Sequence, residues 1–184
     1  MYEGCNPSAL RSQRMLAEAL TRLMGEYAFD EITVTMICQE SDVSRQTFYK
    51  VFGAKENIVR FVAREKCLQL ERELTLRETI GLEELASETF SFFHDNLALV
   101  RQLTDNRLQY LLVEQAQRAL EDLLEVYDCG GDAILDKSNR AFIAGGLIAM
   151  LVQWVECGDS IHVGQRARRF ADLFSVKEFK KHHE

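Results

Sequence analysis

Proline is almost absent from this chain, since Pro7 is its only proline among 184 residues. Proline interrupts helices, so its scarcity leaves long helices uninterrupted. Stretches that alternate strictly between apolar and polar residues, as strands do, are lacking too, whereas the helix-favouring Leu, Ala, Glu and Arg are abundant. These features predict an all-α protein.

Membrane and export signals are also missing. No N-terminal segment has the basic, apolar and small-residue order of a signal peptide. The longest uncharged apolar run, residues 141–152, is too short to cross a bilayer. The sequence therefore predicts a soluble, cytoplasmic protein without a membrane partner.

The cysteines form no recognisable framework. There are five, none is spaced as a CxxC pair, and no histidine cluster accompanies them. A disulfide scaffold or a metal site is therefore not expected. Helical position places two of them in the core, and a redox-sensing role stays open for the other three. The expected core pair is Cys38 and Cys157, and the open set is Cys5, Cys67 and Cys129.

Catalytic signatures are lacking as well. The chain shows no nucleophile–base set, carboxylate pair, metal-ligand spacing or glycine-rich phosphate loop. It is therefore not expected to be an enzyme or to need a cofactor.

Charge is distributed unevenly along the chain. The net charge is −7, yet residues 1–66 carry nine basic and nine acidic side chains, so the whole deficit lies in residues 67–184. An affinity for nucleic acid would therefore depend on the local placement of charge near the N-terminus.

Three helices are predicted there. Asn6 and Pro7 are typical of a helix start, and apolar residues then recur at helical spacing as far as Tyr27. Thr33 is suited to cap a second helix that turns Ile37 and Cys38 inward. Asp42 and Val43 form a tight turn before a third helix, which Ser44 caps and Gly53 ends. This order predicts a helix-turn-helix unit.

The third helix has two unlike faces. At about 100° per residue, Phe48, Val51 and Phe52 fall on one arc, which predicts burial. The opposite arc holds long side chains able to form hydrogen bonds with an outside partner. These are Arg45, Gln46, Tyr49 and Lys50.

Further helices follow to the end of the chain. We expect a domain boundary after residue 54, with a helix at about 55–79 connecting the first domain, 1–54, to the second, 55–184. Cys129 to Asp132 is expected to form a turn, and Gly158 to end a helix. The other helices are expected at about 82–104, 107–127, 136–157 and 163–180.

Residues 11–66 resemble the N-terminal module of TetR-type transcriptional regulators. The resemblance implies a three-helix DNA-binding module followed by a helical bundle that dimerises and encloses a small effector. Two positions depart from the usual pattern: Asp42 stands where glycine is common in the turn, and Val51 where a histidine is common. The residues that carry the resemblance are Phe29, Ile32, Thr33, Ile37, Val43, Ser44, Thr47, Phe48, Tyr49, Phe52, Lys55, Glu56 and Ile58.

The resemblance also implies roles for single residues. Arg45, Gln46 and Lys50 are expected to read base edges, since Arg and Lys suit guanine and Gln suits adenine. Hydroxyls, helix N-termini and lysine suit the DNA backbone. The expected phosphate contacts are Thr33, Ser44, Thr47, Tyr49 and Lys55.

The second domain offers material for a dimer and a pocket. The run 141–152 is apolar on every face, so its helix should be buried on most sides, and Ala141, Gly145 and Ala149 would let a second helix approach closely. Burial inside the monomer is the alternative. Nine residues combine apolar walls with a few polar groups, as a pocket does, although an ordinary core looks similar. They are Phe90, Phe93, His94, Leu97, Tyr110, Val113, Gln117, Met150 and Trp154.

Two functions follow from these patterns. The first is a ligand-responsive homodimer that represses transcription from a palindromic, double-stranded DNA operator and is released by a small apolar or cationic effector. The second is an adaptor or co-activator that keeps the TetR-like fold but binds a protein and does not itself read DNA. The polar arc on the third helix favours the first function.

Overall fold

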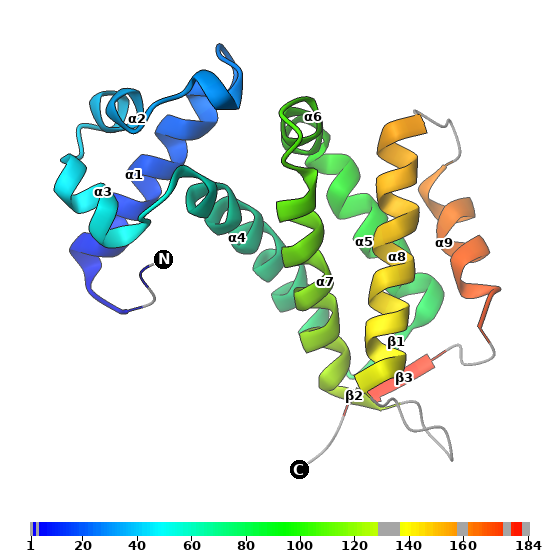
Figure 1. Ribbon diagram of the computed structural model, residues 1–184. Coiled ribbons are helices and arrows are strands. Elements are labelled where there is room, and N and C mark those ends of the chain that lie inside the picture. Colours follow the sequence, from blue (N-terminus) through cyan, green and yellow to red (C-terminus); the bar gives the residue numbers. More distant parts are fainter. Residues whose placement is uncertain (1, 3, 129–136, 158–161, 175–177, 182–184) are drawn as a thin grey trace.

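The computed structural model describes the whole chain except residues 1, 3, 129–136, 158–161, 175–177 and 182–184. Helices dominate, which confirms the all-α class. Figure 1 shows α1, α2 and α3 grouped on one side, the remaining helices bundled on the other, and α4 running between the two groups. The elements are α1 Pro7–Leu23, the 3-10 turn η1 Phe29–Glu31, α2 Val34–Ser41, α3 Arg45–Val51, α4 Lys55–Thr75, β1 Thr79–Gly81, α5 Leu82–Asp95, α6 Leu97–Asp105, α7 Gln109–Glu125, β2 Tyr127–Asp128, α8 Lys137–Cys157, α9 Val163–Ala171 and β3 Glu178–Lys181.

The N-terminal module, which consists of α1, α2 and α3, begins as expected. The Asn6 side chain caps α1 by accepting a hydrogen bond from the Ser8 amide at 2.9 Å. Leu16 and Leu20 then bury one face of the helix. Tyr27 was expected on that face, and this was wrong: α1 ends at Leu23, so Tyr27 lies beyond it and is exposed.

The bundle is built around two helices that run in the same direction. Arg60 on α4 pairs with Glu114 on α7, and two to three turns further along both helices, Glu71 lies with Leu123 beside a shared cavity. Helix α7 also packs against α8, and α5 packs against α9. Side chains on α4 can therefore affect the core through α7.

The helix predicted at 82–104 is two helices. α5 stops at Asp95 and α6 starts at Leu97, because Asn96 has a non-helical backbone with φ −103° and ψ 21°. The Asn96 side-chain amide donates to the Phe92 carbonyl at 2.8 Å. Asparagine competes in this way with the helical hydrogen bonds, and the chain turns.

The C-terminal end also differs from the prediction. The expected helix at 163–180 stops at Ala171, and residues 178–181 form β3 at the centre of a small antiparallel sheet, between β1 and β2. Tyr127 anchors this corner, since its buried hydroxyl donates to the Leu74 carbonyl at 2.8 Å. The turn expected at 129–132 and the stop at Gly158 lie outside the described residues. Within the described ranges, no helix is long and apolar enough to cross a membrane.

Candidate nucleic-acid interface

Helix α3 is divided into the two faces that its sequence predicts. Phe48, Val51 and Phe52 are at most 2% exposed and pack into the module. On the opposite face, Arg45, Gln46 and Lys50 are exposed, and Tyr49 is 52% exposed. Burial of the apolar face fixes the helix, so the polar side chains project outward from a rigid support.

Two of the expected backbone-contacting hydroxyls cap helices. Thr33 Oγ1 accepts from the Met36 amide at 3.2 Å, and Ser44 Oγ accepts from the Thr47 amide at 3.1 Å. Ser44 and Thr47 also share a hydrogen bond of 2.9 Å between their hydroxyls. These bonds satisfy amides that a helix start leaves open. Contact with phosphate stays a prediction for all three, alongside a structural role that is now evident.

The turn between α2 and α3 is left-handed at Asp42, where φ is 52° and ψ 34°. The Asp42 amide donates to the Gln39 carbonyl at 3.4 Å, and the Val43 amide donates to the Cys38 carbonyl at 3.1 Å, which closes the end of α2. Arg45 then reaches back, with Nη1 3.4 Å from the Thr35 hydroxyl. The turn therefore sets α3 at a defined angle to α2.

Lys55, which was expected to contact phosphate, folds back onto the module. Its Nζ donates to the carbonyl oxygens of Phe29 at 2.6 Å and of Ile32 at 2.9 Å. The ammonium also lies 4.2 Å from the centre of the Phe29 ring. Two of its three donors are thus held by the module, and these bonds join the start of α4 to η1. A phosphate contact through the remaining donor is still a prediction.

Comparison with known proteins agrees with this geometry. The family model for bacterial regulatory proteins of the tetR family matches residues 16–62, which span α1, α2, α3 and the start of α4. The N-terminal module belongs to the tetR family. This confirms the resemblance that the sequence predicts.

Individual relatives extend the likeness at lower identity. The transcriptional activator of the dhaKLM operon, DhaS, from Lactococcus lactis is 25% identical over 99 residues, which cover 54% of this chain and 46% of DhaS. The chain thus matches about half the length of that curated relative.

Solved structures of the tetR family share the fold over nearly the whole chain. A TetR-family regulator from Streptomyces coelicolor superposes with a TM-score of 0.69 at 20% identity, over 93% of this chain and 96% of the other. The TetR-family repressor AlkX from Dietzia sp. gives 0.60 at 17% identity, over 88% and 91%. At such identities the likeness shows the fold alone.

The nine residues expected to form one effector pocket are separated in the tetR-like bundle. Phe90 lies edge-on to Trp154, and His94 stacks on the ring of Trp154 with 5.8 Å between the ring centres. Phe93 instead lines a cavity between α4, α5 and α7, and Val113 lines another between α6, α7 and α8. Tyr110 is 54% exposed. The structure therefore brings Phe90, His94 and Trp154 together but places Phe93 and Val113 at separate cavities. Leu97, Gln117 and Met150 are each half-buried, and contact of the nine residues with an effector stays a prediction.

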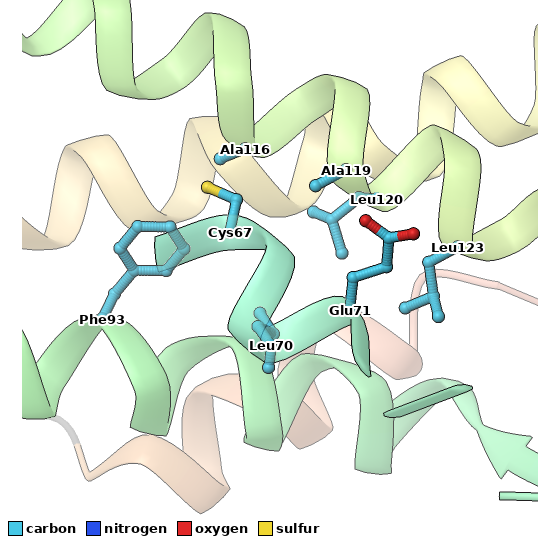
Figure 2. A pocket seen from close by; sticks show the side chains of 8 residues that line it. All are labelled: Cys67, Leu70, Glu71, Phe93, Ala116, Ala119, Leu120 and Leu123. Atoms are coloured by element: carbon cyan, nitrogen blue, oxygen red, sulfur yellow. The ribbon is translucent and has the colours of Figure 1, made fainter. Parts of the chain in front are cut away.

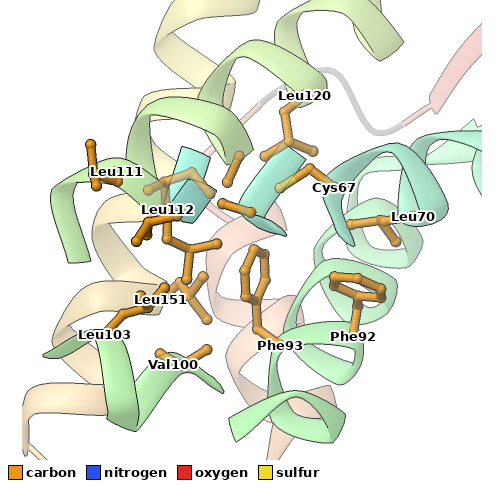
Figure 3. Close-up of a cluster of buried hydrophobic side chains, with 14 of the residues drawn as sticks. Cys67, Leu70, Phe92, Phe93, Val100, Leu103, Leu111, Leu112, Leu120 and Leu151 are labelled. Carbon is orange, nitrogen blue, oxygen red and sulfur yellow. The ribbon is translucent and has the colours of Figure 1, made fainter. Parts of the chain in front are cut away.

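The cavity beside Phe93 is narrow and apolar. It measures about 10 Å³, and Figure 2 shows Cys67 and Glu71 on α4 facing Ala116, Ala119 and Leu120 on α7. The cavity beside Val113 measures about 20 Å³. Figure 3 shows why both are small: Phe93, Leu112 and Leu151 meet between the helices and fill the space. Neither cavity has room for more than a water-sized group in this conformation.

Cys67 is buried in this core and unsuited to redox sensing. Burial, reinforced by the charge of Glu71, raises the pKa of its thiol to about 12. Cysteine reacts as the thiolate, so a buried thiol with this pKa stays inert at neutral pH. Cys38 is also buried, as expected, and Cys5 is exposed. Cys129 lies outside the described residues, as does the side chain of Cys157.

The outer face of α8 is open in the single chain. Ala149 is exposed, Ala141 is half-buried, and a Cβ placed on Gly145 would have no neighbour within 4 Å. Phe142 beside them is 69% exposed. The helix is therefore not buried on every side within the monomer, and a continuous apolar strip is left uncovered.

Proposed function

We propose that this protein is a transcriptional regulator that binds a palindromic DNA operator as a homodimer and is controlled by a small effector. The exposed polar arc of α3 carries the proposal, because it lies on a buried support within a tetR-family module. Regulators of this family bind DNA operators and typically act as dimers. The division at residue 54 into a DNA-binding and an effector-binding domain is part of the same proposal.

The polar side chains of α3 divide into those that read bases and those that contact phosphates. Arg45, Gln46 and Lys50 reach base edges in the major groove, where Arg and Lys recognise guanine and Gln recognises adenine. Tyr49 and Thr47 contact the phosphates, which positions the module without reading sequence. Residues 1–66 carry no net charge, so these local contacts have to provide the affinity.

The open face of α8 supports the dimer. Ala141, Gly145 and Ala149 form a flat strip that a second α8 can approach closely, and the exposed Phe142 adds apolar area. Two modules joined in this way present their α3 helices to successive major grooves, about 34 Å apart. A two-fold operator follows from the two-fold dimer.

Two links carry a signal from the bundle to the module. The first is α4, which begins at the module and continues along α7. The second is α6: Gln102 donates to the Thr21 carbonyl at 3.1 Å, and Asn106 accepts from the Phe29 amide at 2.6 Å. An effector that moves α4 against α7 would tilt the module between these links. The spacing of the two α3 helices would then no longer fit the DNA.

Release by effector makes repression the proposed mode. Relatives of both kinds are known, since DhaS is an activator and AlkX a repressor. An effector that lowers affinity relieves repression, and it does so by binding the two conformations with different affinity.

Titration of duplexes tests the base readers. The dimer is titrated with a selected operator and with a scrambled duplex at several salt concentrations. Arg45→Ala should lose about 1–3 kcal/mol on the operator and little on the scrambled duplex. Tyr49→Phe is the matched comparison, because loss of a phosphate contact weakens binding to both duplexes alike.

Two results would overturn the proposal. An unchanged operator-to-scrambled ratio in Arg45→Ala would remove Arg45 as a base reader. If the wild type prefers no duplex at all, the protein-binding adaptor becomes the better account of the same fold.

A further inference from the structure

A groove of about 320 Å³ runs between α4 and α7, far larger than the two apolar cavities of the bundle. A volume of this size is typical of small-molecule sites. Charged side chains line it at both ends, and opposite signs prevail at the two ends. Because the two helices run in the same direction, one end lies near the DNA-binding module and the other near the small sheet (Figure 1).

Arginines dominate the end near the module. Among the described residues, Glu114 is the one carboxylate lining this end; it forms an ion pair with Arg118 at 2.9 Å and lies 3.5 Å from Arg60. Arg64 also lines this end, and within the described residues it forms no ion pair. Three guanidinium groups thus face one carboxylate, so this end has a positive surplus. Guanidinium groups of this kind bind carboxylates and phosphates with paired hydrogen bonds.

Two carboxylates dominate the far end. Glu71 on α4 faces Asp122 on α7, and in the described part of the chain neither is held in an ion pair. Burial, and then the negative charge of Asp122, raises the pKa of Glu71 above its usual value, although the charges of Arg72 and Arg64 act in the other direction. Like charges left facing each other attract a cation.

An apolar floor joins the two ends. Cys67, Leu68 and Ala119 line the middle of the groove, directly over the narrow cavity of Figure 2. Arg64 and Glu71 are seven residues apart on α4, which places their backbone positions about 10 Å apart along the helix. The groove therefore offers a positive end, an apolar middle and a negative end in a line.

We propose that this groove binds a dipolar organic molecule, with its anionic group at Arg64 and Arg118 and its cationic group at Glu71 and Asp122. An apolar body of about 6–10 Å joins the two groups across Leu68, because the paired ends are seven residues apart on α4 and four residues apart on α7. The inference rests on the proposed function, for which it supplies the class of effector. Such a molecule bridges α4 and α7, so its binding acts on the helix that leads directly to the module.

The test uses 8-aminooctanoic acid, whose charged ends are about 10 Å apart when extended. Its binding to the full-length protein is measured by calorimetry. Octanoate and octylamine, which carry one charge each, and 4-aminobutanoic acid, which is too short, serve as comparisons. The long zwitterion should bind about ten-fold more tightly than any of the three, because it alone satisfies both ends.

Variants assign the ends. Glu71→Gln and Arg64→Gln should each weaken binding of the zwitterion about ten-fold. Glu71→Gln should leave octanoate binding unchanged, because its carboxylate is held at the other end. Glu73→Gln is the matched control, since Glu73 is an exposed carboxylate on the same helix that does not line the groove. Circular dichroism of each variant shows that it has folded.

The outcomes separate this inference from the function it rests on. Equal binding of all four compounds, or variants that bind as the wild type does, would overturn the dipolar site. Release of operator DNA by some other compound would then still support the regulator. Tight binding of the zwitterion at Glu71 and Arg64 without any change in operator affinity would support the site but reject its role as the effector site.

Discussion

At the scale of single residues, Lys55 shows how a tertiary contact can change the meaning of a motif. Its ammonium bridges the Phe29 and Ile32 carbonyls and lies over the Phe29 ring. Both carbonyls belong to the segment between α1 and α2, while Lys55 starts α4. The amide of the same Phe29 donates a hydrogen bond to the side chain of Asn106, at the end of α6. Lys55 therefore stabilises the point where the module meets the bundle.

Replacing Lys55 with methionine should lower the stability of the protein more than its affinity for DNA. Methionine keeps the apolar part of the side chain but lacks the ammonium, so the two carbonyl oxygens lose their donor. A lost hydrogen bond to a charged group costs about 1–3 kcal/mol. Urea unfolding, followed by circular dichroism, measures the loss, and Lys50→Met is the control because Lys50 is exposed on α3. If Lys55→Met unfolds like the wild type but binds every duplex more weakly with a flatter salt dependence, Lys55 is a phosphate contact instead.

The residues of α3 could be predicted from sequence, and the partners of Lys55 could not. The two faces of α3 follow from a turn of 100° per residue, so a few neighbouring letters suffice to separate Phe48 from Tyr49. Lys55 contacts carbonyls 26 and 23 positions earlier. No local pattern reports such a contact. The same limit applies to the nine residues expected to form the effector pocket. Their composition can be read from the sequence, but which cavity each one lines depends on how the helices pack.

At the scale of elements, the features that depend only on neighbouring residues could be predicted from the sequence. Asn6, Thr33 and Ser44 each cap the helix that the sequence assigns to them, because a cap depends on amides two or three residues away. The break at Asn96 and the strand 178–181 were not predicted. The strand forms only because residues 79–81 and 127–128 are brought beside it, and strand preference depends strongly on such context.

The turn before α3 permits a test of element geometry. Asp42 has φ 52°, a left-handed conformation in which a Cβ is strained and glycine is not. We expect stability to fall in the order Asp42→Gly, wild type, Asp42→Ala, with about 1 kcal/mol or more between the two variants. Asp tolerates this region better than Ala, which places the wild type between them. Thermal or chemical denaturation of the three proteins gives the order.

The alanine variant separates backbone strain from the loss of the carboxylate. Both substitutions remove the charge, so a lower stability of the alanine variant reports backbone strain that outweighs the lower entropy of its unfolded chain. Equal stability of Asp42→Gly and Asp42→Ala would mean that strain at this turn is negligible.

At the scale of the whole molecule, the module is joined to the bundle twice. The sequence predicted α4 as the connector, but α6 was hidden within a longer expected helix. Once the chain turns at Asn96, α6 reaches α1 through Gln102 and η1 through Asn106. A cavity lined by Leu20, Val59 and Leu103 lies at this junction. The module is therefore held at two points, so a shift of α4 alone would tilt it about the contact with α6.

The proposed dimer requires that a second copy of the chain covers the outer strip of α8. Gly145 permits a direct test of this contact. A Cβ at Gly145 meets nothing within 4 Å in the single chain, so Gly145→Leu should leave the monomer fold intact and even favour the helix. In a dimer, the leucine would overpack the close approach and weaken association. Light scattering at micromolar concentration should show a dimer for the wild type and a shift toward monomer for the variant. Gly146→Leu is the matched control: its Cβ would lie 3.4 Å from Phe170, so its larger side chain should disturb the contact with α9 inside each subunit. A monomeric wild type would remove the dimer, and with it the two-fold operator, because one module alone has no second half-site to match.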